Sequence, residues 1–312
     1  MRNKITKKYI VIFLCSLLIV AFAFVFIQKT SNTESKHENV SSIKKVSKPQ
    51  KISLVGIGDS LTYGEQDPTK NGGYVYLIKK KLQKNYNVDV STENFGKTGD
   101  RTDQIQKRLE DSDEMQKKVA KADVITMTFG GNDLMQVLQN NFNVLLNDQL
   151  STVMSKQEKN YQRKVESLLD TVRKYNPNAP IFVISVYNPF YVYFPTITDL
   201  QKYTDEWVDV TKKVVKQNRK MYFVNVNQQL SQGQYLNKDQ TELKKQSKLN
   251  LEKLSGSQVE KQLENQKEIN DYLSDNDHFH PNLKGYQLIA DKLYDVMVSH
   301  KSTWLNSDTQ ER

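Results

Sequence analysis

Short runs of apolar residues alternate along the chain with longer stretches in which apolar residues recur at helical spacing. The short runs, which predict strands, cover residues 52–57, 87–90, 122–129, 181–186 and 221–226. The longer stretches, which predict helices, cover residues 75–84, 102–110, 161–175, 200–217 and a last segment that begins at Pro281. Because this alternation is typical of doubly wound sheets, we predict an α/β fold with parallel strands and helices on both faces.

Two segments do not fit the alternation. Residues 134–160 carry an additional apolar stretch after the third predicted strand, and residues 237–274 are rich in Lys, Gln, Glu and Asn. Active sites of doubly wound sheets lie beyond the carboxyl ends of the strands. Both segments would project near that edge, where they either form a lid or substrate wall or are solvated helices without a role in chemistry.

The N-terminal apolar run is long enough to cross a membrane. Residues 10–27 are apolar or small except for Cys15 and Ser16, and eighteen helical residues span about 27 Å, which fits a bilayer core. The basic residues of segment 1–8 would stay in the cytoplasm. We therefore predict a cytoplasmic basic segment 1–8, a transmembrane anchor 9–27 and an extracytoplasmic remainder.

A cleaved signal peptide, which would leave the protein secreted, is the alternative. Ala21-Phe22-Ala23 has the small-x-small form of a cleavage site. The apolar residues 24–27 follow it directly, which favours an uncleaved anchor. Residues 28–50 are polar and predict a disordered tether.

The net charge of +9 is concentrated near the N-terminus. Residues 1–50 contain nine basic and two acidic residues, whereas the remaining 262 contain 36 basic and 34 acidic ones. The body of the protein is therefore nearly neutral, and no nucleic-acid partner is expected. Cys15 is the only cysteine, so the chain has neither an internal disulfide nor a cysteine metal cluster.

Candidate catalytic residues lie at two distant places in the sequence. Ser60 follows the first predicted strand in a Gly-Asp-Ser-Leu segment, and Asp277 and His280 lie near the last predicted helix. A serine hydroxyl is a weak nucleophile at neutral pH, so it needs a base and a group that orients the base. Only a fold that brings both ends of the chain together can place these residues in one site.

Four short segments, each following a predicted strand or preceding the last helix, resemble the sequence blocks of the SGNH (GDSL-type) hydrolase family. They are Gly58-Asp59-Ser60, Asn94-Phe95-Gly96-Lys97-Thr98-Gly99, Gly130-Gly131-Asn132-Asp133 and Asp277-x-x-His280-Pro281. The resemblance covers residues 52–298 and implies a flavodoxin-like five-stranded sheet. With it we expect a hydrolase domain at 51–300 and a tail at 301–312.

The resemblance also implies roles for individual residues. Ser60 matches the nucleophile, His280 the base and Asp277 the residue that orients it. The oxyanion hole would be formed by the backbone N–H groups of Ser60 and Gly96 and by the side-chain amide of Asn132. No metal or cofactor is implied.

Alternatives to these assignments concern neighbouring polar residues. His278 competes with His280, because Asp275 precedes it by three residues just as Asp277 precedes His280. The Pro-Asn-x-x-Gly-Tyr continuation fits the family only with His280 as the base. For His278 we predict a passive surface position, with a role in shaping the loop as the alternative. The same four residues would be an incomplete metal cluster.

Two further acidic residues lie within the resembling blocks. We predict that Asp59 and Asp133 stabilise turns and take no part in catalysis. The histidines at positions 37 and 300 lie outside the predicted core elements.

The loop after the fourth predicted strand, residues 187–195, is densely aromatic. It would line an acyl pocket, stack on sugar rings or pack beneath neighbouring helices. We expect an extracytoplasmic serine ester hydrolase acting on a lipid or an acylated glycan. The alternatives are an O-deacetylase of cell-wall glycans and a catalytically silent surface binding protein on the same fold.

Overall fold

The computed structural model describes residues 48–141, 150–246, 267–309 and 311–312. The predicted cytoplasmic segment, the anchor at 9–27 and nearly all of the tether at 28–50 lie outside these residues. No helix in the described ranges has the length and apolar character needed to cross a membrane. The chain divides into two units between residues 46 and 47, and the second unit contains the fold described below.

A five-stranded sheet forms the centre of this unit, and every neighbouring pair of strands is parallel. In the spatial order β2-β1-β3-β4-β5, the strands are β2 (Val88–Gly96), β1 (Gln50–Gly58), β3 (Val124–Thr128), β4 (Ile181–Ile184) and β5 (Met221–Val224). The order reverses between β1 and β3, which is where doubly wound folds bind their ligands. The predicted α/β fold class is confirmed.

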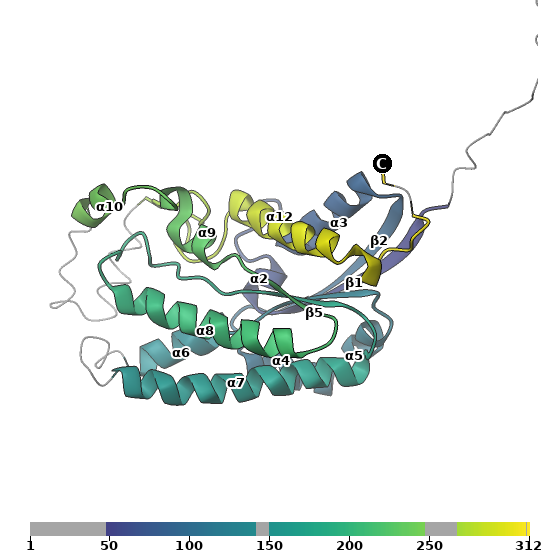
Figure 1. Ribbon diagram of the computed structural model, residues 1–312, viewed down its shortest axis with the longest axis horizontal. Helices are drawn as coiled ribbons and strands as arrows, with labels where there is room; N and C mark the ends of the chain where they lie inside the picture. Colours follow the sequence, from purple (N-terminus) through teal and green to yellow (C-terminus); the bar gives the residue numbers. More distant parts are fainter. Residues whose placement is uncertain (1–47, 142–149, 247–266, 310) are drawn as a thin grey trace, which may run out of the picture. The chain divides into compact units, whose positions relative to one another are not determined.

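Helices cover both faces of the sheet (Figure 1). The face with α3 (Gly73–Asn85) and α12 (Leu283–Ser299) lies opposite the face with α4 (Thr102–Asp111), α5 (Asp113–Ala120), α7 (Leu150–Tyr175) and α8 (Thr198–Gln217). Shorter helices follow the strands or extend the loops: α2 (Ser60–Tyr63), α6 (Gly131–Asn140), α9 (Asn227–Gln232) and α10 (Thr241–Gln246), with single 3₁₀ turns at Gly233–Tyr235 and Lys301–Thr303.

Each face of the sheet has its own apolar core. Met127 packs with Leu168 of α7 on one face, while Leu54 packs with Ile78 of α3 and Ile289 of α12 on the other; all five side chains are fully buried. Burying side chains of this size stabilises the fold by roughly 1.5–3 kcal/mol each. Because an apolar core packs on each face of the sheet, the carboxyl ends of the strands are held in place beside the site.

Two elements differ in length from the predictions. Strand β2 runs to Gly96 because it lies at the edge of the sheet, where the polar residues 91–94 are at least partly exposed and break the apolar pattern. Helix α12 begins at Leu283 because Asn282, not Pro281, caps it: the Asn282 side chain accepts a hydrogen bond from the Gly285 N–H.

The C-terminal segment 301–312, which we expected as a tail, is part of the same structural unit. Trp304 is buried and packs edge-to-face against Tyr86 with ring centroids 5.7 Å apart. Gln50, at the start of β1, hydrogen-bonds with the carbonyl of Trp304, the Asn306 N–H and the Thr309 hydroxyl. The last residues of the chain therefore close over the amino end of the first strand.

The two extra segments are only partly described. Residues 134–160 contain most of α6 and the beginning of α7, while 142–149 lie outside the described residues. Within 237–274 the structure describes α10 and residues 267–274, but not 247–266. The question of a lid in the second segment falls mainly on residues outside the description.

Candidate active site

A buried aspartate forms the turn that carries Ser60. Asp59 ends the extended chain of β1, and its Oδ1 caps α2 by accepting hydrogen bonds from the Leu61 N–H at 3.1 Å and the Thr128 hydroxyl at 2.6 Å. Burial raises the pKa of Asp59 against the opposing effect of these hydrogen bonds. Asp59 stabilises the turn, as predicted, and Ser60 occupies the first position of the helix.

The three residues predicted to form a catalytic triad lie in contact. His280 Nε2 is 2.9 Å from Ser60 Oγ, and His280 Nδ1 is 2.7 Å from Asp277 Oδ2. Asp277 Oδ1 accepts the backbone N–H groups of Phe279 and His280, each at 3.0 Å. Burial acts to raise the pKa of Asp277, but the hydrogen bonds and charge of His280 outweigh it, so the pKa lies below its ordinary value.

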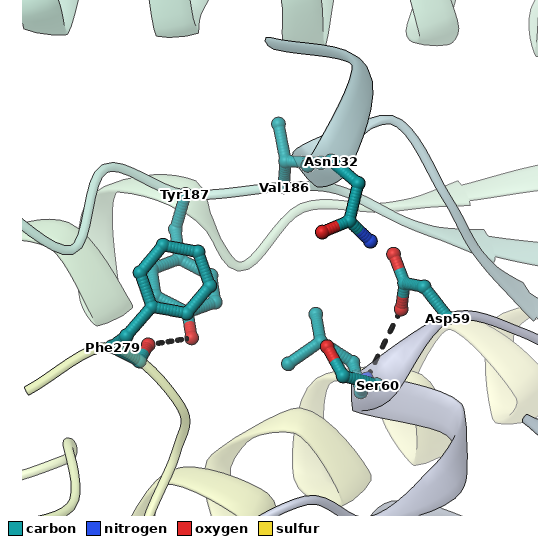
Figure 2. A pocket seen from close by; sticks show the side chains of 8 residues that line it. Asp59, Ser60, Asn132, Val186, Tyr187 and Phe279 are labelled. Atoms are coloured by element: carbon teal, nitrogen blue, oxygen red, sulfur yellow. Dashed lines mark hydrogen bonds between the residues drawn. The ribbon is translucent and has the colours of Figure 1, made fainter. Parts of the chain in front are cut away.

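Asn132 lies across a pocket from Ser60, at the start of α6 (Figure 2). Its Nδ2 donates one hydrogen bond, to the carbonyl of Asp100 at 2.9 Å, and within the described parts of the chain the second amide hydrogen has no acceptor. Tyr187 and Phe279 line another side of this pocket. An amide group that is fixed by one N–H bond and keeps the other N–H free can donate that second hydrogen to a developing oxyanion.

Gly96 does not offer its N–H to the pocket. This N–H donates to the side-chain oxygen of Asn94 at 2.9 Å. A Cβ at Gly96 would lie 2.0 Å from the backbone nitrogen of Tyr63, so glycine is needed there to let β2 approach α2. The structure thus gives Gly96 a packing role in place of the predicted oxyanion-hole role.

Gly99, three residues after Gly96, has the features expected of a backbone donor. It has a left-handed backbone with φ of +83° and lies next to Asp100, whose carbonyl binds Asn132. Its N–H has no acceptor among the residues that the structure describes, and a Cβ on it would meet nothing within 4 Å. The N–H of Ser60 likewise has no acceptor in the described ranges.

Comparison with known proteins agrees with this geometry. Residues 57–288 match the model of the GDSL-like lipase/acylhydrolase family, and this range includes Ser60, Asn132 and His280. The chain belongs to this family. This GDSL-like hydrolase is 26% identical over 286 residues to the uncharacterized protein YpmR of Bacillus subtilis. The match covers 91% of this chain and 94% of YpmR.

Two other relatives of this GDSL-like hydrolase have names that state an activity. It is 30% identical over 166 residues to the spore germination lipase LipC of Bacillus licheniformis, covering 53% of this chain and 74% of LipC. The crystal structure of the lipase Lip_vut3 from a goat rumen metagenome matches with a TM-score of 0.54 at 23% identity, over 78% of this chain and 97% of that one. The structural match supports the fold.

His278 of the hydrolase is buried, so the prediction of a passive surface position is wrong. Only 4% of its side chain is exposed, and its Nδ1 lies 2.7 Å from Glu268 Oε2 and 3.0 Å from the Tyr193 hydroxyl. The sequence alone could not reveal this, because Tyr193 comes from a distant part of the chain and no motif links Glu268 to His278. The two neighbouring histidines therefore have separate carboxylate partners.

The residues considered as a metal cluster do not converge in the hydrolase. His280 binds Asp277, His278 binds Glu268, and Asp275 accepts the backbone N–H of Glu268. Within the described ranges, no three side chains of His, Cys, Asp or Glu are grouped to hold a metal ion.

Asp133 connects three helices of the hydrolase. Its Oδ2 accepts the N–H and the hydroxyl of Thr102 at the start of α4, and its Oδ1 binds Lys164 of α7 at 3.0 Å. It is buried, and these bonds engage both of its carboxylate oxygens. Its role is structural, as predicted.

Arg108 of α4 is a site-supporting residue that sequence reasoning missed. Its guanidinium donates to the carbonyls of Gly58 and Phe95 at 3.0 and 2.9 Å and to the Asp100 carboxylate at 2.8 Å. It thereby ties the carboxyl ends of β1 and β2 to the loop that contains Asp100. In the sequence it resembles any arginine on the exposed face of a helix, so no signal marked it.

The aromatic loop 187–195 divides between two roles. Tyr187 and Phe190 line pockets beside Ser60. The side chains of Val192, Tyr193 and Phe194 instead form a small separate core with a leucine of α10. Both roles expected from the sequence, pocket wall and packing, are therefore present in one loop.

Proposed function

We propose that this GDSL-like hydrolase cleaves carboxylic esters through an acyl-enzyme on Ser60. The observation that carries the proposal is the continuous chain of contacts from Ser60 Oγ to His280 Nε2 and from His280 Nδ1 to Asp277, at 2.9 and 2.7 Å. The name of one relative, the spore germination lipase LipC, supports ester hydrolysis.

The reaction would proceed in two steps that share the same base. His280 Nε2 takes the proton of Ser60 as its Oγ attacks the ester carbonyl, and the imidazolium then protonates the departing alkoxide. Water next loses a proton to His280 and attacks the acyl-enzyme; the acid leaves and Ser60 regains its proton. Asp277 holds the imidazole with its Nδ1 protonated and stabilises its positive charge.

The negative oxygen of each tetrahedral intermediate needs donors in the pocket. We assign this role to the free amide hydrogen of Asn132 and to the backbone N–H groups of Ser60 and Gly99. Gly99 replaces Gly96 in this assignment because the N–H of Gly96 is already bonded to Asn94. Each donor of this kind typically contributes about 10²–10³ in rate.

The proposed location is extracytoplasmic, with the hydrolase held to the membrane by residues 9–27. Support comes from the apolar run at 10–27 and from the basic residues that precede it. Esters of envelope lipids and acylated wall polymers would be within reach there. Membrane flotation of the full-length protein, compared with a variant lacking residues 1–27, tests the anchor; recovery of the intact protein in the medium would refute it.

The decisive experiment on activity uses the Ser60→Ala variant of the full-length protein. We expect the wild type to hydrolyse p-nitrophenyl esters and to be labelled at Ser60 by a fluorophosphonate, and the variant to lose both while keeping its melting temperature. If the wild type hydrolyses no ester of any chain length and is not labelled, the chain is a silent member of its family and the proposal fails.

A further inference from the structure

A second pocket adjoins the one that contains Ser60. It shares Gly131, Tyr187 and Phe279 with the first pocket. Its remaining walls come from α6, from the loop after β4 and from the beginning of α8. A group attached to a carbonyl at Ser60 can therefore extend from the first pocket into the second.

The lining of the second pocket is apolar. Six of its side chains are Leu134, Met135, Leu138, Pro189, Phe190 and Leu200. None of the described residues that line it is charged, and its polar members besides Tyr187 are Asn188 and Thr204. An apolar pocket of this kind favours a hydrocarbon chain by about 0.8 kcal/mol for each buried methylene group.

The two polar residues of this pocket are already engaged within the protein. Asn188 Oδ1 accepts the N–H of Phe190 at 3.0 Å, and the Thr204 hydroxyl donates to the carbonyl of Leu200 at 2.8 Å. A sugar ring would bring several hydroxyl groups into the pocket and find few partners for them, which is costly. The pocket chemistry thus disfavours a glycan at this position.

We propose that the second pocket binds the acyl chain of the substrate, so that the hydrolase prefers esters of longer fatty acids over acetates. This inference rests on the proposed function, because it takes Ser60 as the nucleophile. Each methylene group that enters the apolar pocket should raise kcat/KM until the chain extends beyond the lining residues.

Phe279 lines both the pocket that contains Ser60 and the second pocket. Its ring packs edge-on against the His280 ring with centroids 5.0 Å apart and lies 6.2 Å from the ring of Phe190. The Tyr187 hydroxyl donates to the carbonyl of Phe279 at 2.6 Å, which fixes this wall (Figure 2). An acyl chain in the second pocket would therefore pack against the same ring that contacts the catalytic base.

The test measures kcat/KM for p-nitrophenyl esters of two to sixteen carbons. The wild type should gain about fourfold for each added methylene up to the optimum and then level off or decline. The Leu200→Asp variant, which places a carboxylate in the pocket, should lower the octanoate-to-acetate ratio of kcat/KM at least tenfold.

The matched control is Leu288→Asp, which makes the same change at a half-buried leucine of α12 on the other face of the sheet. It should leave the octanoate-to-acetate ratio unchanged. Preference for acetate in the wild type, or an equal loss on all esters in Leu200→Asp, would overturn the acyl site and point to a deacetylase. In either case fluorophosphonate labelling of Ser60 would remain, so failure of this inference is distinct from failure of the proposed function.

A different observation, the buried contact between His278 and Glu268, supports a second inference. Both side chains are less than 5% exposed, and no more than 3.0 Å separates His278 Nδ1 from either Glu268 or the Tyr193 hydroxyl. A hydrogen on Nδ1 of His278 would be donated to the Glu268 carboxylate oxygen. These three residues lie outside the triad and take no direct part in the proposed proton transfers.

The cluster fixes the segment that carries two triad members. His278 directly follows Asp277 and has a left-handed backbone with φ of +54°, a costly conformation for a residue with a side chain. Tyr193 belongs to the loop that also forms the wall of the acyl pocket. We infer that His278 is a positioning residue, which holds Asp277 and His280 in register with Ser60 through its buried partners.

The test compares His278→Ala with His278→Asn. Asparagine tolerates the left-handed backbone and can place an amide hydrogen where Nδ1–H lies. We expect His278→Ala to lower kcat and the rate of fluorophosphonate labelling by tenfold or more with little change in KM. His278→Asn should restore at least half of the lost activity on a logarithmic scale.

Circular dichroism at the assay temperature establishes that both variants are folded. Full activity in folded His278→Ala would overturn the positioning role. An equal loss in both variants would also overturn it, because the contact would then not be what the site requires. If His278→Ala does not fold, Glu268→Gln, which keeps the shape and removes the charge, should show the same fall in kcat.

Discussion

Replacing Asp277 by Asn tests the orienting role of this carboxylate with little disturbance of the fold. Oδ1 of Asp277 accepts two backbone N–H groups at 3.0 Å, while Oδ2 faces His280 Nδ1 at 2.7 Å. The amide of the variant has one oxygen only, and turning its NH₂ toward the two N–H groups would set donors against donors. The amide oxygen must therefore keep the backbone contacts, and the NH₂ must face His280.

An NH₂ group beside Nδ1 forces His280 into the wrong tautomer. Nδ1 becomes the acceptor and Nε2 carries the hydrogen, so Nε2 cannot take the proton of Ser60. The same change in a serine protease triad lowers kcat by about 10⁴, which corresponds to about 5 kcal/mol in the activation barrier. We expect a loss of this size on p-nitrophenyl octanoate in Asp277→Asn.

Stability separates this effect from misfolding. Because the backbone contacts remain, the free energy of unfolding of Asp277→Asn should change by less than about 1 kcal/mol in urea titrations. Asp277→Ala removes the acceptor for both N–H groups and should lose stability as well as activity. A folded Asp277→Asn variant that keeps more than a tenth of wild-type kcat would refute the reasoning.

Three further predictions concern the surroundings of the site. Gly96→Ala should lower the melting temperature strongly and abolish activity, because its Cβ would lie 2.0 Å from a backbone nitrogen of α2. Gly99→Ala, which has open space around it, should lower the free energy of unfolding by only about 1 kcal/mol. Equal thermal shifts in the two variants would contradict this reasoning. Arg108→Met should lower the free energy of unfolding by about 3 kcal/mol and slow fluorophosphonate labelling, because three acceptors at and near the strand ends lose their donor. Unchanged labelling would show that the turn carrying Ser60 does not depend on Arg108. Burial acts to raise the pKa of Asp67, but hydrogen bonds from Gly73, Thr69 and Asn71 outweigh it and hold the pKa below its ordinary value. The stability that wild type has over Asp67→Asn should thus be present above about pH 4 and disappear as the pH falls further, and a pH-independent difference would refute this.

The fold was predictable because each of its central strands contains a short run of buried, mostly apolar residues. The pattern failed at β2, whose edge position lets residues such as Glu93 and Asn94 face solvent. Ser60, His280 and Asp277 could be selected because serine catalysis requires these residue types together, and the structure places them in contact.

The parts of the site that could not be predicted depend on contacts that no sequence motif marks. Gly96 and Gly99 are both glycines in one loop, and only the bond from Gly96 to Asn94 shows which N–H is already used. The burial of His278 depends on Glu268 and Tyr193, and the role of Arg108 depends on carbonyl groups that carry no sequence signal. Such contacts become visible only when the strands and loops are assembled.

The bonds between Gln50 and the C-terminal segment have a consequence for how the enzyme reaches its substrate. They lie at the amino end of β1, and Ser60 follows the carboxyl end of the same strand, roughly 26 Å away at about 3.3 Å per residue. A tether through residues 28–50 would thus join the domain at the edge remote from the catalytic pocket. Reach would then be set by the length of the tether, so shortening it should restrict bilayer-bound substrates before it affects soluble ones.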